Sequence, residues 1–278
     1  MKTASPMRSL LRAISIIKSF TPKELELSGA EIARKVGIAK TTAYRILECL
    51  TENGLLEQNE KRGKYTIGRE LYVQGSLYLG STDVLKAAEP VMETLNDLTN
   101  EAVNLGILDK GNVVFIMKAE SKYHFRFAIH IGSVIPAYAS TMGKALLSEL
   151  TEEELARLYP DEKLTPVTKK TIPTKTELKL DLEKIRKSGI SFDNEGGYEG
   201  VDGIGSVIRD TTGKAIAAMS ISVPVFRRDQ TYRKRLETLV RLGTNLVSYR
   251  LGYQDKDYTV RDIEEIRLWW KQSKSSLQ

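Results

Sequence analysis

The chain has 278 residues, of which 41% are hydrophobic and 28% charged, and its formal net charge is +6. That length suits two domains, and no stretch approaches the roughly 18 uninterrupted apolar residues that a membrane-spanning helix requires. One cysteine and two histidines exclude an internal disulfide and argue against zinc modules and cysteine–histidine nucleophiles. We therefore expect a cytoplasmic protein with no secretory signal, membrane partner, metal site or cofactor.

The positive charge is concentrated at one end of the chain. Residues 1–80 contain thirteen Lys or Arg, eight Glu and no Asp, whereas residues 81–278 contain 29 basic and 28 acidic residues. This asymmetry suggests a basic module joined to a neutral one. A solvated helical surface would carry the same surplus, so the position of the basic residues must distinguish the two interpretations.

Two helices are predicted at the start of the chain. Apolar residues at helical spacing indicate the first, over 9–20. Ser28 and Glu31 form a capping box that opens the second, because each side chain satisfies an N–H group that the helix start leaves unpaired. Gly37 ends this helix, since glycine adopts the positive φ of a tight exit turn without strain.

A third helix follows that turn after about three residues and is predicted to open at Thr41 or Thr42. The short connection is typical of a helix-turn-helix, whose second member lies in the DNA major groove. Hydroxyl and basic groups near its start suit phosphate contact, and Arg45 could instead reach a guanine edge. The residues predicted to contact DNA from this helix are Lys40, Thr41, Thr42, Tyr44 and Arg45.

Two extended segments, at 55–57 and 65–67, flank a basic stretch that contains glycine. This pattern predicts a β-hairpin wing whose tip approaches the sugar–phosphate backbone. Lys61, Arg62 and Lys64 are the DNA-binding residues predicted at the tip.

A linker helix is predicted over 69–80, with more apolar residues than a solvated linker needs. It is therefore expected to pack against its own domain or against a partner subunit. A second helix, over 83–99, then opens the larger half of the chain.

The larger half is predicted to be an α+β domain in which helices pack on one antiparallel sheet. Its first strands, 102–108 and 112–118, are joined by an Asp-Lys-Gly turn that is typical of a hairpin. Alternating apolar residues predict another strand over 125–131. His124 and His130 fall on the opposite face of that strand, so we interpret both as surface residues without a catalytic role.

Capping and turn residues delimit the remaining elements. Thr151 and Thr174 each precede a glutamate by three residues and are predicted to open a helix. Further strands and one long helix are expected at 190–193, 203–208, 215–223 and 229–251.

Three polar features of this half suggest a small-molecule site. The helix start at Thr141-Met142 offers N–H groups that suit a carboxylate or a phosphate. Asp193 directly follows a strand, and Ser220 and Ser222 share one strand face because their parity matches. Each feature alone is also explained by an ordinary structural role, namely a cap, a solvated loop or a hydroxyl bonded within the sheet.

Enzymatic interpretations fit the sequence less well. Gly143-Lys144 lacks both the spaced glycine and the following hydroxyl of a phosphate-binding loop, so nucleotide hydrolysis is rejected. A hydrolase using Asp193 or Ser220 would need a histidine base, and no nucleophile-elbow motif is present. A hydrolase and a ligand-sensing adaptor that does not bind DNA remain the alternatives.

Several stretches, in the right order, resemble the IclR family of bacterial transcriptional regulators. They are a recognition-helix segment, the end of a wing, an effector-domain helix start and two late signature stretches, at 37–50, 65–68, 140–147, 189–195 and 217–224. The resemblance implies a winged helix-turn-helix domain followed by a GAF-like effector domain. It also implies homodimers or homotetramers on a palindromic double-stranded DNA operator, with a small metabolite, often a carboxylic acid, that shifts DNA affinity.

The resemblance also implies which residues bind the effector. Carried over by motif, they are Thr141, Met142, Asp193, Val201, Gly203, Ser220 and Ser222. The chain departs from the family at Gly203, where members often have Cys, and at Gly196, where they often have Glu. The missing side chain at Gly203 is expected to enlarge or reshape the pocket floor, so no particular ligand is inferred.

The predicted function is a ligand-responsive DNA-binding transcriptional regulator. Its predicted parts are a winged helix-turn-helix domain, a linker helix, a GAF-like effector-binding domain and a C-terminal helical extension, at 1–68, 69–80, 81–252 and 253–278. In the extension, Trp269 and Trp270 are expected to pack onto the parent domain or an adjacent subunit. The sequence leaves open the effector, the operator and the choice between repressor and activator.

Overall fold

The computed structural model describes residues 6–21, 24–59, 62–80, 83–123, 129–227, 229–254 and 260–275. The chain divides into two compact units, Met1–Thr82 and Asp83–Gln278. None of the helices in the described ranges is long and apolar enough to cross a membrane.

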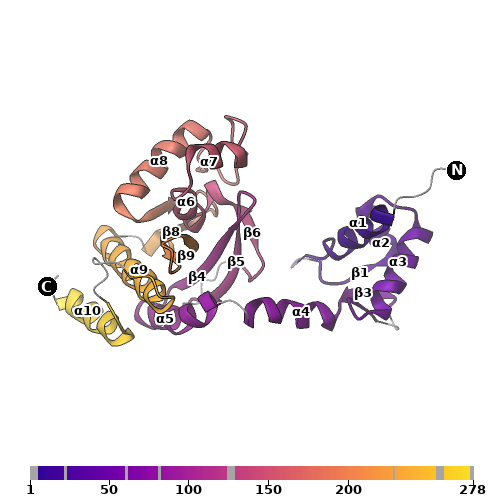
Figure 1. The fold of residues 1–278 in the computed structure, drawn as a ribbon, viewed down its shortest axis with the longest axis horizontal. Helices are drawn as coiled ribbons and strands as arrows, with labels where there is room; N and C mark the ends of the chain where they lie inside the picture. The colour runs from indigo at the N-terminus through magenta and orange to yellow at the C-terminus, as the bar shows by residue number, and fades with distance from the viewer. Residues whose placement is uncertain are drawn as a thin grey trace. The chain divides into compact units, whose positions relative to one another are not determined.

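The N-terminal unit is a winged helix-turn-helix (Figure 1). Its helices are α1 (Pro6–Ile17), α2 (Gly29–Val36), α3 (Lys40–Glu52) and α4 (Arg69–Gly80). Its strands β1 (Leu27–Ser28), β2 (Leu56–Asn59) and β3 (Lys64–Ile67) form an antiparallel sheet in the order β1-β3-β2. Ile16, Ile32 and Leu47 are fully buried where α1, α2 and α3 meet.

The capping predicted for α2 is confirmed. The Ser28 side chain accepts a hydrogen bond from the Glu31 N–H, the Glu31 carboxylate accepts one from the Ser28 N–H, and Gly37 ends the helix at φ 69°. The start predicted for α3 is wrong. The cap is Ala39, which makes no side-chain hydrogen bond, so Thr41 and Thr42 lie inside the first turn. Burial of Ala43 and Leu47 therefore positions this helix without a hydroxyl cap.

The first helix also differs from the prediction, because α1 ends at Ile17. Its apolar residues lie on two faces. Ile16 is buried in the core of the unit, whereas four others form an exposed stripe at positions Met7, Leu10, Leu11 and Ile14.

The C-terminal unit contains one six-stranded antiparallel sheet in the order β6-β5-β4-β9-β8-β7. The strands are β4 (Ala102–Asp109), β5 (Asn112–Ala119), β6 (Val134–Pro136), β7 (Ser191–Asn194), β8 (Val201–Arg209) and β9 (Ala215–Pro224). The helices are α5 (Asp83–Thr99), α6 (Thr141–Leu147), α7 (Glu152–Leu158), α8 (Lys175–Ser188), α9 (Gln230–Arg250) and α10 (Ile263–Ser275), with 3₁₀ turns η1 (Ala137–Ala139) and η2 (Val225–Arg227). The predicted α+β class, with helices packed on an antiparallel sheet, is confirmed.

The sheet lies between α5 and α9 on one side and α6, α7 and α8 on the other (Figure 1). It separates two hydrophobic cores. Alternation along each strand decides which core a side chain joins. Val103 and Leu105 on β4 pack with α5 and α9, and so do Met219 and Ile221 on β9. Residues of the opposite parity, such as Ala218, face α6, α7 and α8. The predicted ligand residues on β7, β8 and β9 have this second parity.

The strand predicted over 125–131 is not seen in its described part. Residues 124–128, including His124, lie outside the described residues, and 129–131 are not in a strand. The Ser133 N–H donates to the His130 carbonyl, and Gly132 has φ 85°, which makes a turn before the edge strand β6. Of this segment Ile129 is buried, whereas His130 is exposed as predicted.

The C-terminal helix α10 packs on its own unit, against α5 and α9. Ile266 and Trp270 are buried in the core that those helices form. The Arg235 guanidinium carbon lies 3.9 Å from the centre of the Trp270 ring, a cation–π geometry.

Candidate DNA interface and effector cavity

The start of α3 presents polar and basic side chains to solvent. Lys40, Thr41, Tyr44 and Arg45 are exposed, and Thr42 is half-buried. Within the described part of the chain, the side chains of Lys40 and Arg45 make no ion pair or hydrogen bond with protein groups. No carboxylate among the described residues therefore neutralises their charge, which leaves it available to an external anion.

Tyr44 differs from its neighbours because it also packs within the unit. A Cβ on Gly29 would lie 2.7 Å from a carbon of the Tyr44 ring. The ring therefore sits directly against the first residue of α2. This contact fixes the ring beside the start of α2 while about half of its surface stays exposed.

The wing carries two of its three predicted basic residues within the described structure. Lys61 lies outside the described residues. Arg62 is exposed, with a guanidinium nitrogen 3.6 Å from a Glu26 carboxylate oxygen, and Lys64 is half-buried at the start of β3. An exposed pair at that distance contributes little to stability, so Arg62 can exchange Glu26 for another anion.

All seven residues predicted to bind the effector line one cavity between the sheet and α6. They are Thr141, Met142, Asp193, Val201, Gly203, Ser220 and Ser222. The free space among the lining residues is about 380 Å³, including the part that opens to solvent. The structure thus brings together residues from α6, β7, β8 and β9 that the sequence separates by up to 81 positions.

The floor of the cavity depends on glycine at position 203. A Cβ on Gly203 would lie 2.0 Å from the Thr141 Oγ1 and 3.0 Å from its Cβ. The Thr141 side chain therefore fills the place where a side chain at 203 would begin. Glycine at 203 therefore shapes the floor, because the threonine hydroxyl takes the space that a Cβ at 203 would need.

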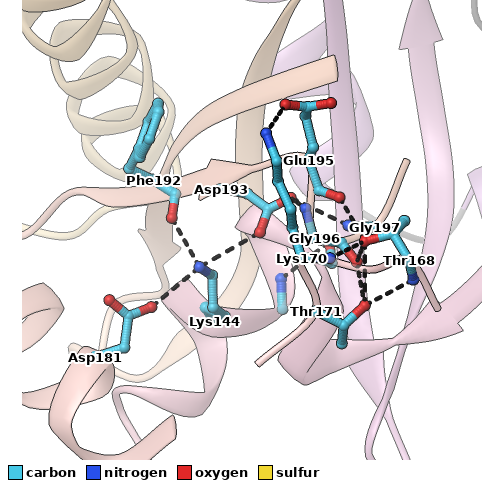
Figure 2. Close-up of polar contacts among 12 residues, drawn as sticks. Lys144, Thr168, Lys170, Thr171, Asp181, Phe192, Asp193, Glu195, Gly196 and Gly197 are labelled. Carbon is cyan, nitrogen blue, oxygen red and sulfur yellow. Dashed lines mark hydrogen bonds and ion pairs between the residues drawn. The ribbon is translucent and has the colours of Figure 1, made fainter. Parts of the chain in front are cut away.

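Asp193 is buried beside the cavity and is held by two hydrogen bonds and one ion pair (Figure 2). One carboxylate oxygen accepts hydrogen bonds from the Gly196 N–H at 2.9 Å and the Gly197 N–H at 3.2 Å. The other oxygen lies 3.4 Å from the Lys144 Nζ. Burial raises the pKa of Asp193, and the Lys144 ammonium and the two N–H donors oppose that rise.

Lys144 joins Asp193 to a second helix. Its side chain is 5% exposed, and its Nζ donates to the Phe192 carbonyl at 2.7 Å and lies 3.0 Å from the Asp181 carboxylate on α8 (Figure 2). Lys144, which belongs to the Gly143-Lys144 pair that was rejected as a phosphate-binding loop, is thus a buried cation that links α6 to β7 and α8.

A short segment before α8 fastens the loop that follows β7. The Thr171 hydroxyl donates to the Gly196 carbonyl at 2.7 Å, and the Thr168 hydroxyl donates to the Glu195 carbonyl at 2.7 Å. Lys170 pairs with the Glu195 carboxylate (Figure 2). Since Gly197 and Tyr198 line the cavity, these contacts hold one of its walls in place.

Sequence reasoning missed eight lining residues. They are Asn104, Phe115, Ile129, Ile135, Ala139, Ser140, Gly197 and Tyr198. Most have apolar or very small side chains, which do not indicate a binding role in the sequence. Asn104 did carry one, because it is a polar residue inside the apolar stretch 102–108.

The charged group at the cavity is engaged within the protein. In the described ranges no three His, Cys, Asp or Glu side chains are grouped so that they could hold a metal ion. Asp193 is already engaged by Lys144 and two N–H groups. His130 is not among the residues that line the cavity, and His124 lies outside the described residues.

Two family models match the chain. The model described as "IclR helix-turn-helix domain" matches residues 9–60, and the model described as "Bacterial transcriptional regulator IclR C-terminal" matches residues 76–249. The chain belongs to the IclR family. It is thus a transcriptional regulator with an N-terminal helix-turn-helix domain.

Relatives of this IclR-family regulator align along most of both chains. The HTH-type transcriptional regulator KdgR of Escherichia coli (strain K12) is 28% identical over 91% of this chain and 96% of its own length. The HTH-type transcriptional repressor AllR of Salmonella typhi is 32% identical over 88% of this chain and 90% of its own length. The crystal structure of Thermotoga maritima IclR covers 89% of this chain and 100% of its own, with a TM-score of 0.72 and 28% identity.

Proposed function

We propose that this IclR-family regulator binds a palindromic DNA operator as a homo-oligomer and that a small organic acid in the cavity changes its DNA affinity. The observation that carries the proposal is the presence in one chain of two separate binding features. One is the exposed basic start of α3, whose cations have no partner among the described residues, and the other is the cavity between α6 and the sheet.

The DNA contacts are assigned to α3 and the wing. In a helix-turn-helix the start of the second helix approaches base edges while neighbouring residues contact phosphates. The proposed set is Lys40, Thr41, Thr42, Tyr44, Arg45, Lys61, Arg62 and Lys64. The exposure of Lys40 and Arg45 supports this assignment, because phosphate neutralisation requires cations that protein carboxylates have not already paired.

The effector contacts are assigned to the polar end of the cavity. Thr141, Ser220 and Ser222 place hydroxyl donors there, while Met142 and Val201 supply apolar walls. No Lys or Arg is among the described lining residues, so neutral donors would hold a carboxylate. A few polar groups in a mostly apolar cavity are the usual composition of a small-molecule site.

Oligomerisation is assigned to the exposed stripe on α1. Met7, Leu10, Leu11 and Ile14 follow the i, i+3, i+4, i+7 spacing of one helix face and lie open to solvent. Two copies joined through such a face would be related by a two-fold axis. Paired α3 helices would then read half-sites separated by about 34 Å, one turn of the duplex, or by a multiple of it.

Repression is the proposed output, supported by relatives named as repressors, among them AllR of Salmonella typhi and the transcriptional repressor IclR of Escherichia coli (strain K12). Ligand and DNA would favour different arrangements of the subunits. Their coupling is reciprocal and typically amounts to about 1–3 kcal/mol.

The test has two stages. The full chain is first used to select DNA from a random duplex library, and anisotropy at fixed salt then measures its affinity for the selected sequence. A panel of small organic, sugar and aromatic acids is added next. We expect an enriched palindrome and at least one acid that changes its affinity fivefold or more, about the lower end of the usual coupling. Selection of no sequence at low salt would favour the adaptor alternative and overturn the proposal.

A further inference from the structure

Asn104 is a buried polar residue at the centre of the sheet. It lies on β4 opposite Ser220 of β9, is 1% exposed and lines the cavity. Its Nδ2 donates a hydrogen bond to the Ser222 Oγ at 3.1 Å. Its Oδ1 is buried and has no hydrogen-bond partner among the described residues.

An unpartnered amide oxygen at this depth needs an explanation. Buried polar groups in proteins are almost always hydrogen-bonded, because removing them from water without a partner is unfavourable. An apolar side chain would pack on this face at no such penalty. Since Asn104 also borders the cavity, the missing partner is supplied most simply by a molecule that enters it.

We propose that the Asn104 Oδ1 accepts a hydrogen bond from a hydroxyl group of the effector, so that the effector is a hydroxylated organic acid. This inference rests on the proposed function, because it takes the cavity as the effector site. It adds a selectivity residue and narrows the ligand class from organic acids to hydroxy acids.

The surroundings of Asn104 favour a hydroxyl over an ammonium as the donor. Ser220 and Ser222 beside it are neutral, and Asp193 is the one carboxylate among the described lining residues. Asp193 already faces the Lys144 ammonium and two backbone N–H groups. An ammonium in the cavity would therefore lack a free counter-ion, whereas a hydroxyl needs only the amide oxygen.

The test compares acids that differ by one hydroxyl. Isothermal titration calorimetry on the full chain measures lactate against propionate, 3-hydroxybutyrate against butyrate, and 2-hydroxyhexanoate against hexanoate, with alanine and 2-methoxypropionate added. The variants are Asn104→Leu and Asn104→Ala, so that one suffices if the other does not fold. Asn112→Ala, which removes an asparagine from the same sheet away from the cavity, is the matched control.

We expect one pair or more in which the wild type binds the hydroxy acid about tenfold tighter than its partner, since a buried acceptor left unpaired is penalised by roughly that factor. Either Asn104 variant should reduce the ratio to within about twofold, and Asn112→Ala should preserve it. Three results would overturn this inference while leaving the proposed function intact. The wild type could bind both members of every pair equally well, or the Asn104 variants could keep the preference for the hydroxy acid. Alanine or the methoxy acid could also bind more tightly than lactate. Binding of no acid would overturn the proposed effector class as well.

Discussion

The Thr141 hydroxyl occupies the space in which a side chain at residue 203 would begin, with its Oγ1 2.0 Å from the ideal position of a Cβ on Gly203. Glycine at 203 and threonine at 141 therefore form a matched pair on the cavity floor. Because the first residue of α6 is one of the two, a change at either position alters both the cavity and the start of that helix.

Gly203→Cys is expected to destabilise the C-terminal unit by about 1–3 kcal/mol, the usual range for overpacking a filled site. Urea unfolding of the full chain measures this. The double variant Gly203→Cys with Thr141→Ala should recover a large part of the loss, because removing the hydroxyl relieves the closest contact. Purely additive effects of the two substitutions would show that they do not compete for the same space.

Arg45→Ala is expected to weaken operator binding about tenfold or more, because it removes from the proposed DNA face an exposed cation that pairs with none of the described residues. Affinity for the effector should not change. Anisotropy with the selected operator at several salt concentrations measures both the affinity and the salt slope. Arg157→Ala on α7 changes the net charge equally and serves as the control. Equal loss in the two variants would point to net charge instead of a specific contact.

Asp193→Asn is expected to change how stability depends on pH. The pKa of Asp193 is raised in the folded chain above its ordinary 3.8, so between these two values the folded state binds more protons than the unfolded state. The contribution of Asp193 to stability therefore falls as pH rises through that window, and the asparagine variant lacks this fall. The difference in unfolding free energy between the two proteins, measured from pH 4 to pH 8, reports it. A difference that grows more favourable to the wild type over this range would contradict the assigned direction.

Lys144→Met is expected to destabilise the protein by about 3–5 kcal/mol, because it leaves Asp193 as a buried carboxylate without its cation. Combining it with Asp193→Asn should recover part of the loss, as the remaining group is then neutral. Chemical denaturation of the four proteins forms a complete cycle. Lys179→Met on the exposed side of α8 is the control and should have little effect.

Leu10→Lys together with Leu11→Lys is expected to reduce self-association and operator affinity, since both residues belong to the exposed stripe on α1. Light scattering coupled to size exclusion measures the oligomeric state. Leu180→Lys replaces a leucine of similar exposure on α8 and should leave the state unchanged. An oligomer that survives the double substitution would place the subunit contact elsewhere.

Local sequence signals predicted the helix boundaries best where side chains act on their own backbone. The Ser28 and Glu31 capping box and the turn at Gly37 were found because their partners lie within a few residues. Ala39 carries no such signal, and packing of Ala43 against the core positions α3 instead. The strand expected over 125–131 shows the same limitation, since alternation of apolar residues cannot reveal the turn at Gly132.

The family resemblance predicted the cavity residues that lie in its motifs, whereas the residue pattern alone predicted fewer of them. Parity assigned Ser220 and Ser222 to one face of a strand, and the register between β4 and β9 then sets Asn104 beside them. This register could not be predicted from the sequence, because the two strands are more than a hundred residues apart in the chain. Asn104 was visible in the sequence as a polar residue in an apolar stretch, but only the sheet shows which space it borders.

The packing of α10 against α5 and α9 has a practical consequence for isolating the C-terminal unit. The matched family region ends at residue 249, whereas Ile266 and Trp270 lie buried against α5 and α9. A fragment that ends at the family boundary would lack α10, so the hydrophobic residues that this helix covers would be exposed to water. Such a fragment would be prone to aggregation. Screens for effectors on the separated unit should therefore retain the chain through Ser275.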